Sequence, residues 1–71
     1  MEYLVVVEKG GSSYGAYVPD LPGCVAAAET HRDAVRLIRE AIALHIDALR
    51  KSGQPVPAPA STSEVVKVRA A

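Results

Sequence analysis

The order of apolar and polar positions predicts a chain that begins with strands, continues into one long helix and ends in a further strand. Residues 3–7 form an apolar run rich in valine, which is typical of a strand with neighbours on both sides. Residues 14–18 alternate after a Gly-Gly-Ser-Ser turn, so the two runs predict an antiparallel hairpin. We expect the first strand to lie inside the sheet.

The strongest periodic pattern covers residues 31–52. Projected at about 100° per residue, its apolar side chains fill one arc and its charged side chains fill the other. Thr30 and Asp33 form a capping pair that predicts the start of this helix, and Gly53 fits its C-terminal cap. Residues 24–29 are therefore expected to be a third strand, whose small alanines let the helix lie close to the sheet.

The apolar arc of this helix is wider than one sheet can cover. The spare surface is at its two edges: Leu37, Leu44 and Ala48 on one, Val35 and Ile46 on the other. A chain of 71 residues buries only about 60% of its unfolded surface, so its stability alone is expected to be marginal. Both observations predict self-association, as a homodimer or a higher homo-oligomer.

After the helix, residues 54–60 alternate proline with small residues and predict an extended, semi-rigid strap that carries the chain back across the sheet. Residues 63–69 alternate well enough for a final strand, which is so near the terminus that its order depends on pairing with the sheet or with a partner. The whole chain, 1–71, is thus predicted to be one α+β domain of β-β-β-α-β order, with one long helix on a mainly antiparallel sheet.

Residues 17–24 read Tyr-Val-Pro-Asp-Leu-Pro-Gly-Cys and connect the second and third predicted strands. The two prolines predict a stiff, outward-facing loop, Asp20 can accept hydrogen bonds from nearby backbone N–H groups, and Gly23 permits a positive φ. Two interpretations stay open for Leu21, which lies between the prolines. It either folds back onto the core within a well-made turn, or it is held out as the anchor of a binding loop.

The composition excludes several functional classes. The net charge is zero, which indicates no overall attraction to nucleic acid or to an anionic membrane. The chain shows neither a signal segment nor an apolar run of membrane-spanning length, so a soluble, cytoplasmic protein is expected. Cys24 is the single cysteine, which rules out an intramolecular disulfide and a thiolate zinc cluster and favours a small buried residue in a reducing compartment.

Candidate catalytic chemistry is sparse. The acidic residues are scattered, and only Glu8 and Asp20 fall near strand ends where they could meet, which is too few for a metal centre. His31 lies at the exposed start of the helix, and His45 lies within its apolar face, where we expect it to hydrogen-bond in the core. The pattern therefore predicts no catalytic residue, no cofactor and no metal.

Basic residues follow one side of the exposed helix face: Arg32, Arg36, Arg39 and Arg50. Acidic residues run beside them at spacings of three and four, so a solvated, self-paired face is favoured over a nucleic-acid footprint.

The segments 3–8, 14–24 and 37–45 together resemble the HicB-type antitoxins of bacterial and archaeal toxin–antitoxin pairs, and the similarity runs from the N-terminus to about Pro59. The resemblance implies a partial ribonuclease H fold without its catalytic acids. It also implies an antitoxin that binds and blocks a HicA-type toxin, a small ribonuclease that resembles a double-stranded-RNA-binding domain and cleaves RNA with a histidine.

With this resemblance, the loop becomes the candidate partner-binding site. The residues assigned to it are Tyr17, Asp20, Leu21, Pro22, Gly23 and Cys24. Leu21 would be the apolar anchor, and the Asp20 carboxylate would face a cationic RNA-binding surface of the toxin.

Many relatives append a helix-turn-helix or ribbon-helix-helix module that binds operator DNA, whereas about a dozen residues follow Pro59 here, which puts DNA binding by this chain in doubt. The alternatives are a solitary HicB-like binding module without a toxin, and a weak nucleic-acid-binding protein that uses the arginine side of the helix.

Overall fold

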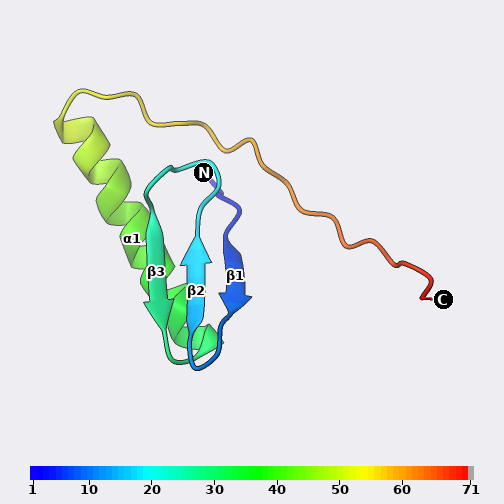
Figure 1. Ribbon diagram of the computed structural model, residues 1–71. Coiled ribbons are helices and arrows are strands. Elements are labelled where there is room, and N and C mark those ends of the chain that lie inside the picture. The colour runs from blue at the N-terminus through cyan, green and yellow to red at the C-terminus, as the bar shows by residue number, and fades with distance from the viewer. Residues whose placement is uncertain (71) are drawn as a thin grey trace.

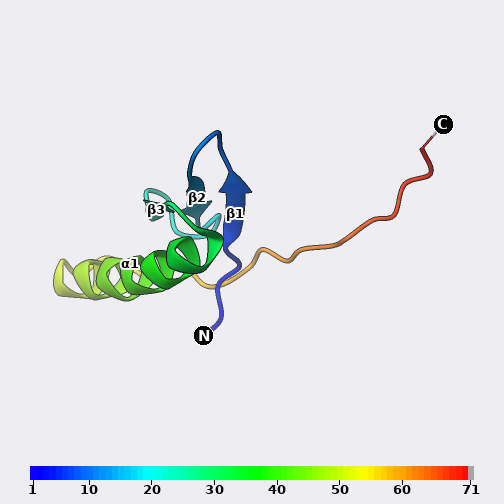
Figure 2. The ribbon, with the colours of Figure 1, turned by 90° about the horizontal axis from the view of Figure 1, so that it is seen from below.

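The computed structural model describes residues 1–70 and contains, within them, three strands and one helix (Figure 1). Strands β1 (Val6–Lys9), β2 (Tyr14–Tyr17) and β3 (Val25–Ala28) form an antiparallel sheet in the order β1-β2-β3. Helix α1 (His31–Lys51) packs across one face of this sheet, mainly against β3 (Figure 2). The predicted α+β class is confirmed.

The first two strands form the predicted hairpin, in which Val7 pairs with Ala16 and the Gly10 N–H donates to the Ser13 carbonyl at 2.7 Å. Strand β1 nevertheless lies at the edge of the sheet, so the expectation of an inner strand is wrong. The unbroken apolar run has another cause: Val5 and Val7 pack against the core, while Val6 is half-buried on the opposite face beside Tyr17.

The core lies between the sheet and the first half of α1. Its buried members are Ala16, Val18, Leu21, Cys24, Ala34 and Ile38. Ala26 pairs with Ala16 and packs against this cluster, so the small side chains of β3 allow the helix to approach closely, as predicted.

Both predicted ends of the helix are confirmed. The Asp33 N–H donates to Thr30 Oγ1 at 3.1 Å, which caps the N-terminus. At the other end Gly53 adopts φ 73°, its N–H donates to the Arg50 carbonyl at 3.1 Å, and the Gln54 N–H donates to the Leu49 carbonyl at 2.9 Å. This pair of bonds is a Schellman motif, which requires a left-handed residue where the glycine stands.

The C-terminal end of α1 extends past the sheet (Figure 1). Ile42 and Ile46 still pack against the core, while Leu44 is 71% exposed. His45 is half-buried, so its predicted place in the core is wrong. Within residues 1–70, no helix meets the length and apolar character needed to cross a membrane.

Residues 54–70 contain neither helix nor strand. The predicted strap, 54–60, is extended and passes over the end of the sheet that carries the loop (Figure 1). Beyond Ser61 the chain leaves the domain, and the predicted strand at 63–69 is not formed (Figures 1 and 2). The physical reason is that none of the strands within residues 1–70 lies beside it, so its backbone finds no hydrogen-bonding partner there.

Candidate functional site

The loop between β2 and β3 is closed by its own backbone. The Val18 N–H donates to the Cys24 carbonyl at 3.2 Å, the Leu21 N–H to the Val18 carbonyl at 3.1 Å, and the Cys24 N–H to the Leu21 carbonyl at 3.1 Å. Gly23 adopts φ 84°, the positive value that the sequence predicted. The loop is therefore a fixed structure, and its backbone bonds decide which side chains face inward.

Leu21 points into the core and is fully buried, at 0% exposure. The interpretation in which it is held out as an anchor is wrong, and the interpretation in which it folds back within a turn is correct. Cys24 is also buried, and burial raises the pKa of its thiol. Both side chains support the loop from within and are not accessible to a partner in this conformation.

The Asp20 carboxylate is bound to the strap. Its Oδ2 accepts the N–H groups of Ala60 and Ser61, each at 2.9 Å, and its Oδ1 accepts the Ser61 hydroxyl at 2.8 Å. The N–H of Ala60, followed by the N–H and hydroxyl of Ser61, lowers the pKa of this carboxyl. Tyr3 adds a second attachment, because its hydroxyl donates to the Pro57 carbonyl. We call these two contacts the strap latch.

Three of the predicted site residues remain accessible: Tyr17, Pro22 and Gly23. Tyr17 is 41% exposed and lies on the face of the sheet opposite α1, between Val6 and Val25 in the pairing register. Val25 is 66% exposed. The three side chains form an apolar cross-strand row on a sheet face that no other described segment covers (Figure 1).

Val6 and Val25 were not assigned to the site from the sequence. Strand alternation supplied a signal, because a residue opposite Tyr17 in either neighbouring strand must share its face. Applying that signal requires the register of both strand pairs, which a single strand pattern does not provide.

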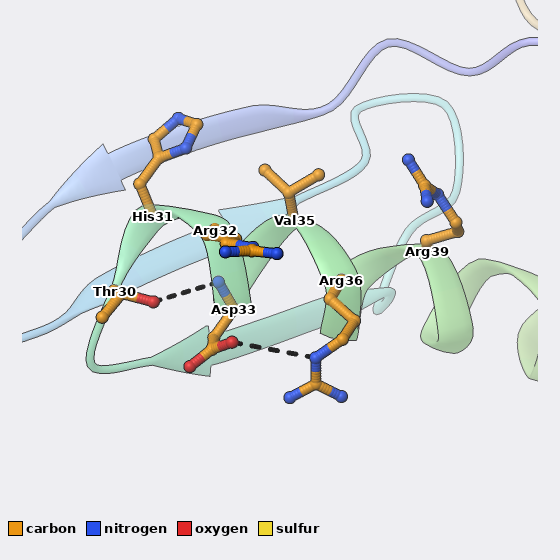
Figure 3. A pocket seen from close by; sticks show the side chains of 7 residues that line it. All are labelled: Thr30, His31, Arg32, Asp33, Val35, Arg36 and Arg39. Atoms are coloured by element: carbon orange, nitrogen blue, oxygen red, sulfur yellow. Dashed lines mark hydrogen bonds and ion pairs between the residues drawn. The ribbon is translucent and has the colours of Figure 1, made fainter.

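A second candidate is a shallow hollow at the start of α1 (Figure 3). It is lined by Thr30, His31, Arg32, Asp33, Val35, Arg36 and Arg39. The His31 ring meets the Tyr14 ring edge-on, with centroids 5.9 Å apart and planes at 83°.

Arg36 forms exposed ion pairs, 3.8 Å from Asp33 and 3.7 Å from Glu40, as expected of a self-paired face. Such exposed pairs contribute little to stability. Neither here nor in the rest of residues 1–70 do three or more His, Cys, Asp or Glu side chains form a group that could hold a metal ion.

Comparison with known proteins assigns the family. Residues 3–70 match the HicB_like antitoxins of bacterial toxin–antitoxin systems, and the chain belongs to this family. Its fold is similar to the crystal structure of the N-terminal domain of the Burkholderia pseudomallei antitoxin HicB, with a TM-score of 0.77 and 43% identity over 87% of this chain and 74% of that one. The match confirms the resemblance seen in the sequence.

A chain of the HicA3 and HicB3 toxin–antitoxin complex is also similar, with a TM-score of 0.72 and 35% identity over 84% of this chain and 70% of that one. Among curated relatives, a UPF0150 protein of Thermoplasma acidophilum is 36% identical over 80% of this chain and 84% of its own length. An uncharacterised 14.9 kDa protein of Haemophilus phage HP1 is 35% identical over 80% of this chain, which spans 43% of that relative.

Proposed function

We propose that this protein is an antitoxin that binds and occludes a small HicA-type ribonuclease toxin without itself being an enzyme. The observation that carries the proposal is the similarity, at 35% identity and a TM-score of 0.72, to a chain of the HicA3 and HicB3 toxin–antitoxin complex. Membership of the antitoxin family supports it. Because such a toxin acts on RNA, we place the interaction in the cytoplasm.

The contact surface in this proposal is the uncovered sheet face together with the exposed part of the loop. Tyr17 supplies an aromatic anchor, which is the type of residue that most often dominates protein interfaces. Val6 and Val25 flank it, and Pro22 and Gly23 extend the surface onto the loop. A sheet face and a loop held by its own hydrogen bonds lose little conformational freedom on docking.

The buried loop residues have an indirect role in this proposal. Leu21 and Cys24 fill the core beneath the loop, and Asp20 joins the loop to the strap. Substituting them would disturb the shape of the surface without removing a contact, so they are unsuitable probes of the interface.

The test is co-purification with a HicA-type toxin encoded in the neighbouring reading frame, followed by an RNA-cleavage assay. The unmodified protein is expected to suppress cleavage. The double variant Tyr17→Ala with Val25→Ser is expected to weaken binding at least roughly tenfold, since truncating a hot-spot aromatic costs about 2 kcal/mol or more and about 1.4 kcal/mol already corresponds to tenfold.

Leu44→Ser is the control, because Leu44 is also apolar and is about as exposed as Val25 but lies on α1 away from the sheet face. Inhibition that survives the double variant in folded protein would contradict the assigned surface. Failure of the unmodified protein to inhibit its neighbouring toxin would overturn the function and favour a solitary binding module.

A further inference from the structure

The sheet face opposite α1 carries a second cross-strand row beside the row that contains Tyr17 (Figure 1). In the pairing register, Gly15 of β2 stands between Glu8 of β1 and Ala27 of β3. These three residues lie on the uncovered face, because the residues next to them in each strand pack against the core. Among the described strand positions of this face, Glu8 carries the only charge, so the face is apolar with one acidic edge.

Within residues 1–70, the fold does not require a glycine at the centre of this row. Gly15 does not have a positive φ, and an added Cβ would meet nothing within 4 Å beyond its neighbours in the chain. Glycine inside a strand costs conformational entropy and packs no side chain, and it often marks a place where another group approaches the backbone closely. The space above Gly15 is therefore open to a group from outside the chain.

Three different side chains surround this open space. Tyr17, two positions along β2, supplies an aromatic ring that is 41% exposed. Glu8 supplies an exposed carboxylate from β1, and no ion pair within residues 1–70 engages it. Ala27 supplies an exposed methyl group from β3. Glu8 and Tyr17 are diagonal neighbours on paired strands, about 7–8 Å apart, so one planar group between them can contact both.

These surroundings select a guanidinium group. Its plane stacks on an aromatic ring, its N–H groups bind a carboxylate in pairs, and its flat shape lies against a floor of glycine and alanine. A lysine ammonium fits less well, because it is a compact, strongly hydrated charge without a face to stack. A neutral apolar group would cover Glu8 and leave its charge without a partner.

We propose that Glu8, Gly15, Tyr17 and Ala27 form a subsite for an arginine side chain from the RNA-binding surface of the toxin. The inference rests on the proposed function and names the chemical group that the antitoxin binds. A toxin that cleaves RNA needs cationic side chains to hold the phosphates. In the subsite Glu8 takes the place of a phosphate and Tyr17 the place of a stacked base. An arginine bound there is withheld from RNA, which gives the occlusion a chemical basis.

The first test measures binding of the full 71-residue protein to the HicA-type toxin of the neighbouring reading frame, by calorimetry at several salt concentrations. Glu8→Gln keeps the shape of the side chain and removes its charge, so we expect about tenfold weaker binding and a shallower salt dependence. Glu40→Gln is the matched control, because it makes the same change on the exposed surface of α1 and should leave both unaltered. Equal binding by Glu8→Gln and the unmodified protein would overturn the subsite.

The second test fills the open space with Gly15→Val. Valine favours strands and its Cβ has room, so resistance to urea should be unchanged or increased, while toxin binding should weaken by more than about tenfold. Gly11→Val is the control, since that position also has open space and no positive φ but lies in the hairpin turn. A folded Gly15→Val protein that binds the toxin with full affinity would contradict the proposal.

The third test identifies the bound group by double-mutant cycles. Each arginine and each lysine of the toxin is replaced in turn by glutamine and combined with Glu8→Gln. We expect one toxin arginine to show a coupling of at least about fivefold with Glu8, and its replacement to weaken RNA binding by the free toxin. Coupling to a lysine, coupling to no cation, or an arginine whose loss leaves RNA binding unchanged would each overturn the assignment.

The outcomes separate this inference from the proposed function. If the unmodified protein does not bind its neighbouring toxin, the proposed function fails and the subsite fails with it. If the unmodified protein binds and inhibits, and the Glu8 and Gly15 variants do so equally well, the function stands and only the subsite is wrong.

Discussion

Asp20 holds Ser61 through both of its carboxylate oxygens, with Oδ2 accepting the N–H at 2.9 Å and Oδ1 accepting the hydroxyl at 2.8 Å, across 41 positions of the chain. The Ala60 N–H donates to the same Oδ2. One side chain in the loop thus sets the course of the strap and the point from which residues 63–69 leave the domain.

The strap latch should be sensitive to acid. Three donors favour the charged form of Asp20 and lower its pKa, so the Asp20 contact of the latch contributes fully above the ordinary aspartate value of about 3.9 and is lost as pH falls through the lowered value. Chemical shifts and exchange protection of the Ala60 and Ser61 amides, followed from neutral pH to about 2, should report this release.

Asp20→Asn removes the charge and should abolish this pH dependence while reducing protection of both amides at neutral pH. Asp33→Asn is the control, because Asp33 lies at the start of α1 and pairs with Arg36, away from the strap. If the strap amides keep full protection in Asp20→Asn, the latch does not rest on the carboxylate charge.

Leu21→Ala should destabilise the domain by about 2–4 kcal/mol, because a fully buried leucine loses its transfer free energy and leaves a cavity. Urea unfolding followed by circular dichroism measures the loss. Leu44→Ala, at a position 71% exposed, should change the free energy of unfolding by less than about 0.5 kcal/mol. Equal effects of the two substitutions would mean that Leu21 is not in the core.

Gly23→Ala should cost about 1–2 kcal/mol from backbone strain alone. Its φ of 84° is disfavoured for a residue with a Cβ, while the space around an added Cβ is empty. Gly11→Ala is the matched control, since that position also has open space and has no positive φ. A difference near zero between the two variants in urea unfolding would show that the loop relaxes to a negative φ.

Thr30→Ala should cost about 1 kcal/mol through loss of the helix cap, which for a domain of this size lowers the melting temperature by roughly 4–8 °C. Thr62→Ala, in the exposed chain after the strap, should leave the melting temperature unchanged. An unchanged temperature for Thr30→Ala in differential scanning calorimetry would indicate that a water molecule replaces the cap.

The sequence predicted the helix and the hairpin closely because both depend on local interactions. Thr30 caps the amide of a residue three positions away, and the bonds around Gly53 close within one turn. The Gly-Gly-Ser-Ser turn likewise brings its two strands together over a few residues. The relevant partners lie inside the window in which the pattern is read.

The candidate site was predicted less well, and Leu21 and Asp20 show why. The pattern around them indicated a stiff loop, and the loop is closed by its own hydrogen bonds. The direction of each side chain was decided elsewhere: Leu21 lies in the core that α1 covers, and Asp20 binds the strap. Contacts between residues so far apart in the chain are not visible in the local sequence pattern. The exposure of the Leu21 and Asp20 side chains could therefore not be predicted from it.

The sequence by itself determined the family, the class of fold, the ends of α1 and the conformation of Gly23, because each rests on short-range interactions or on a motif read directly. The tertiary structure decided that β1 lies at an edge, that Tyr17 shares a face with Val25, and that residues 63–69 leave the domain. A strand forms its backbone hydrogen bonds with a neighbouring strand, and that neighbour comes from a distant segment of the chain. The pattern of side chains within one segment does not specify which segment pairs with it.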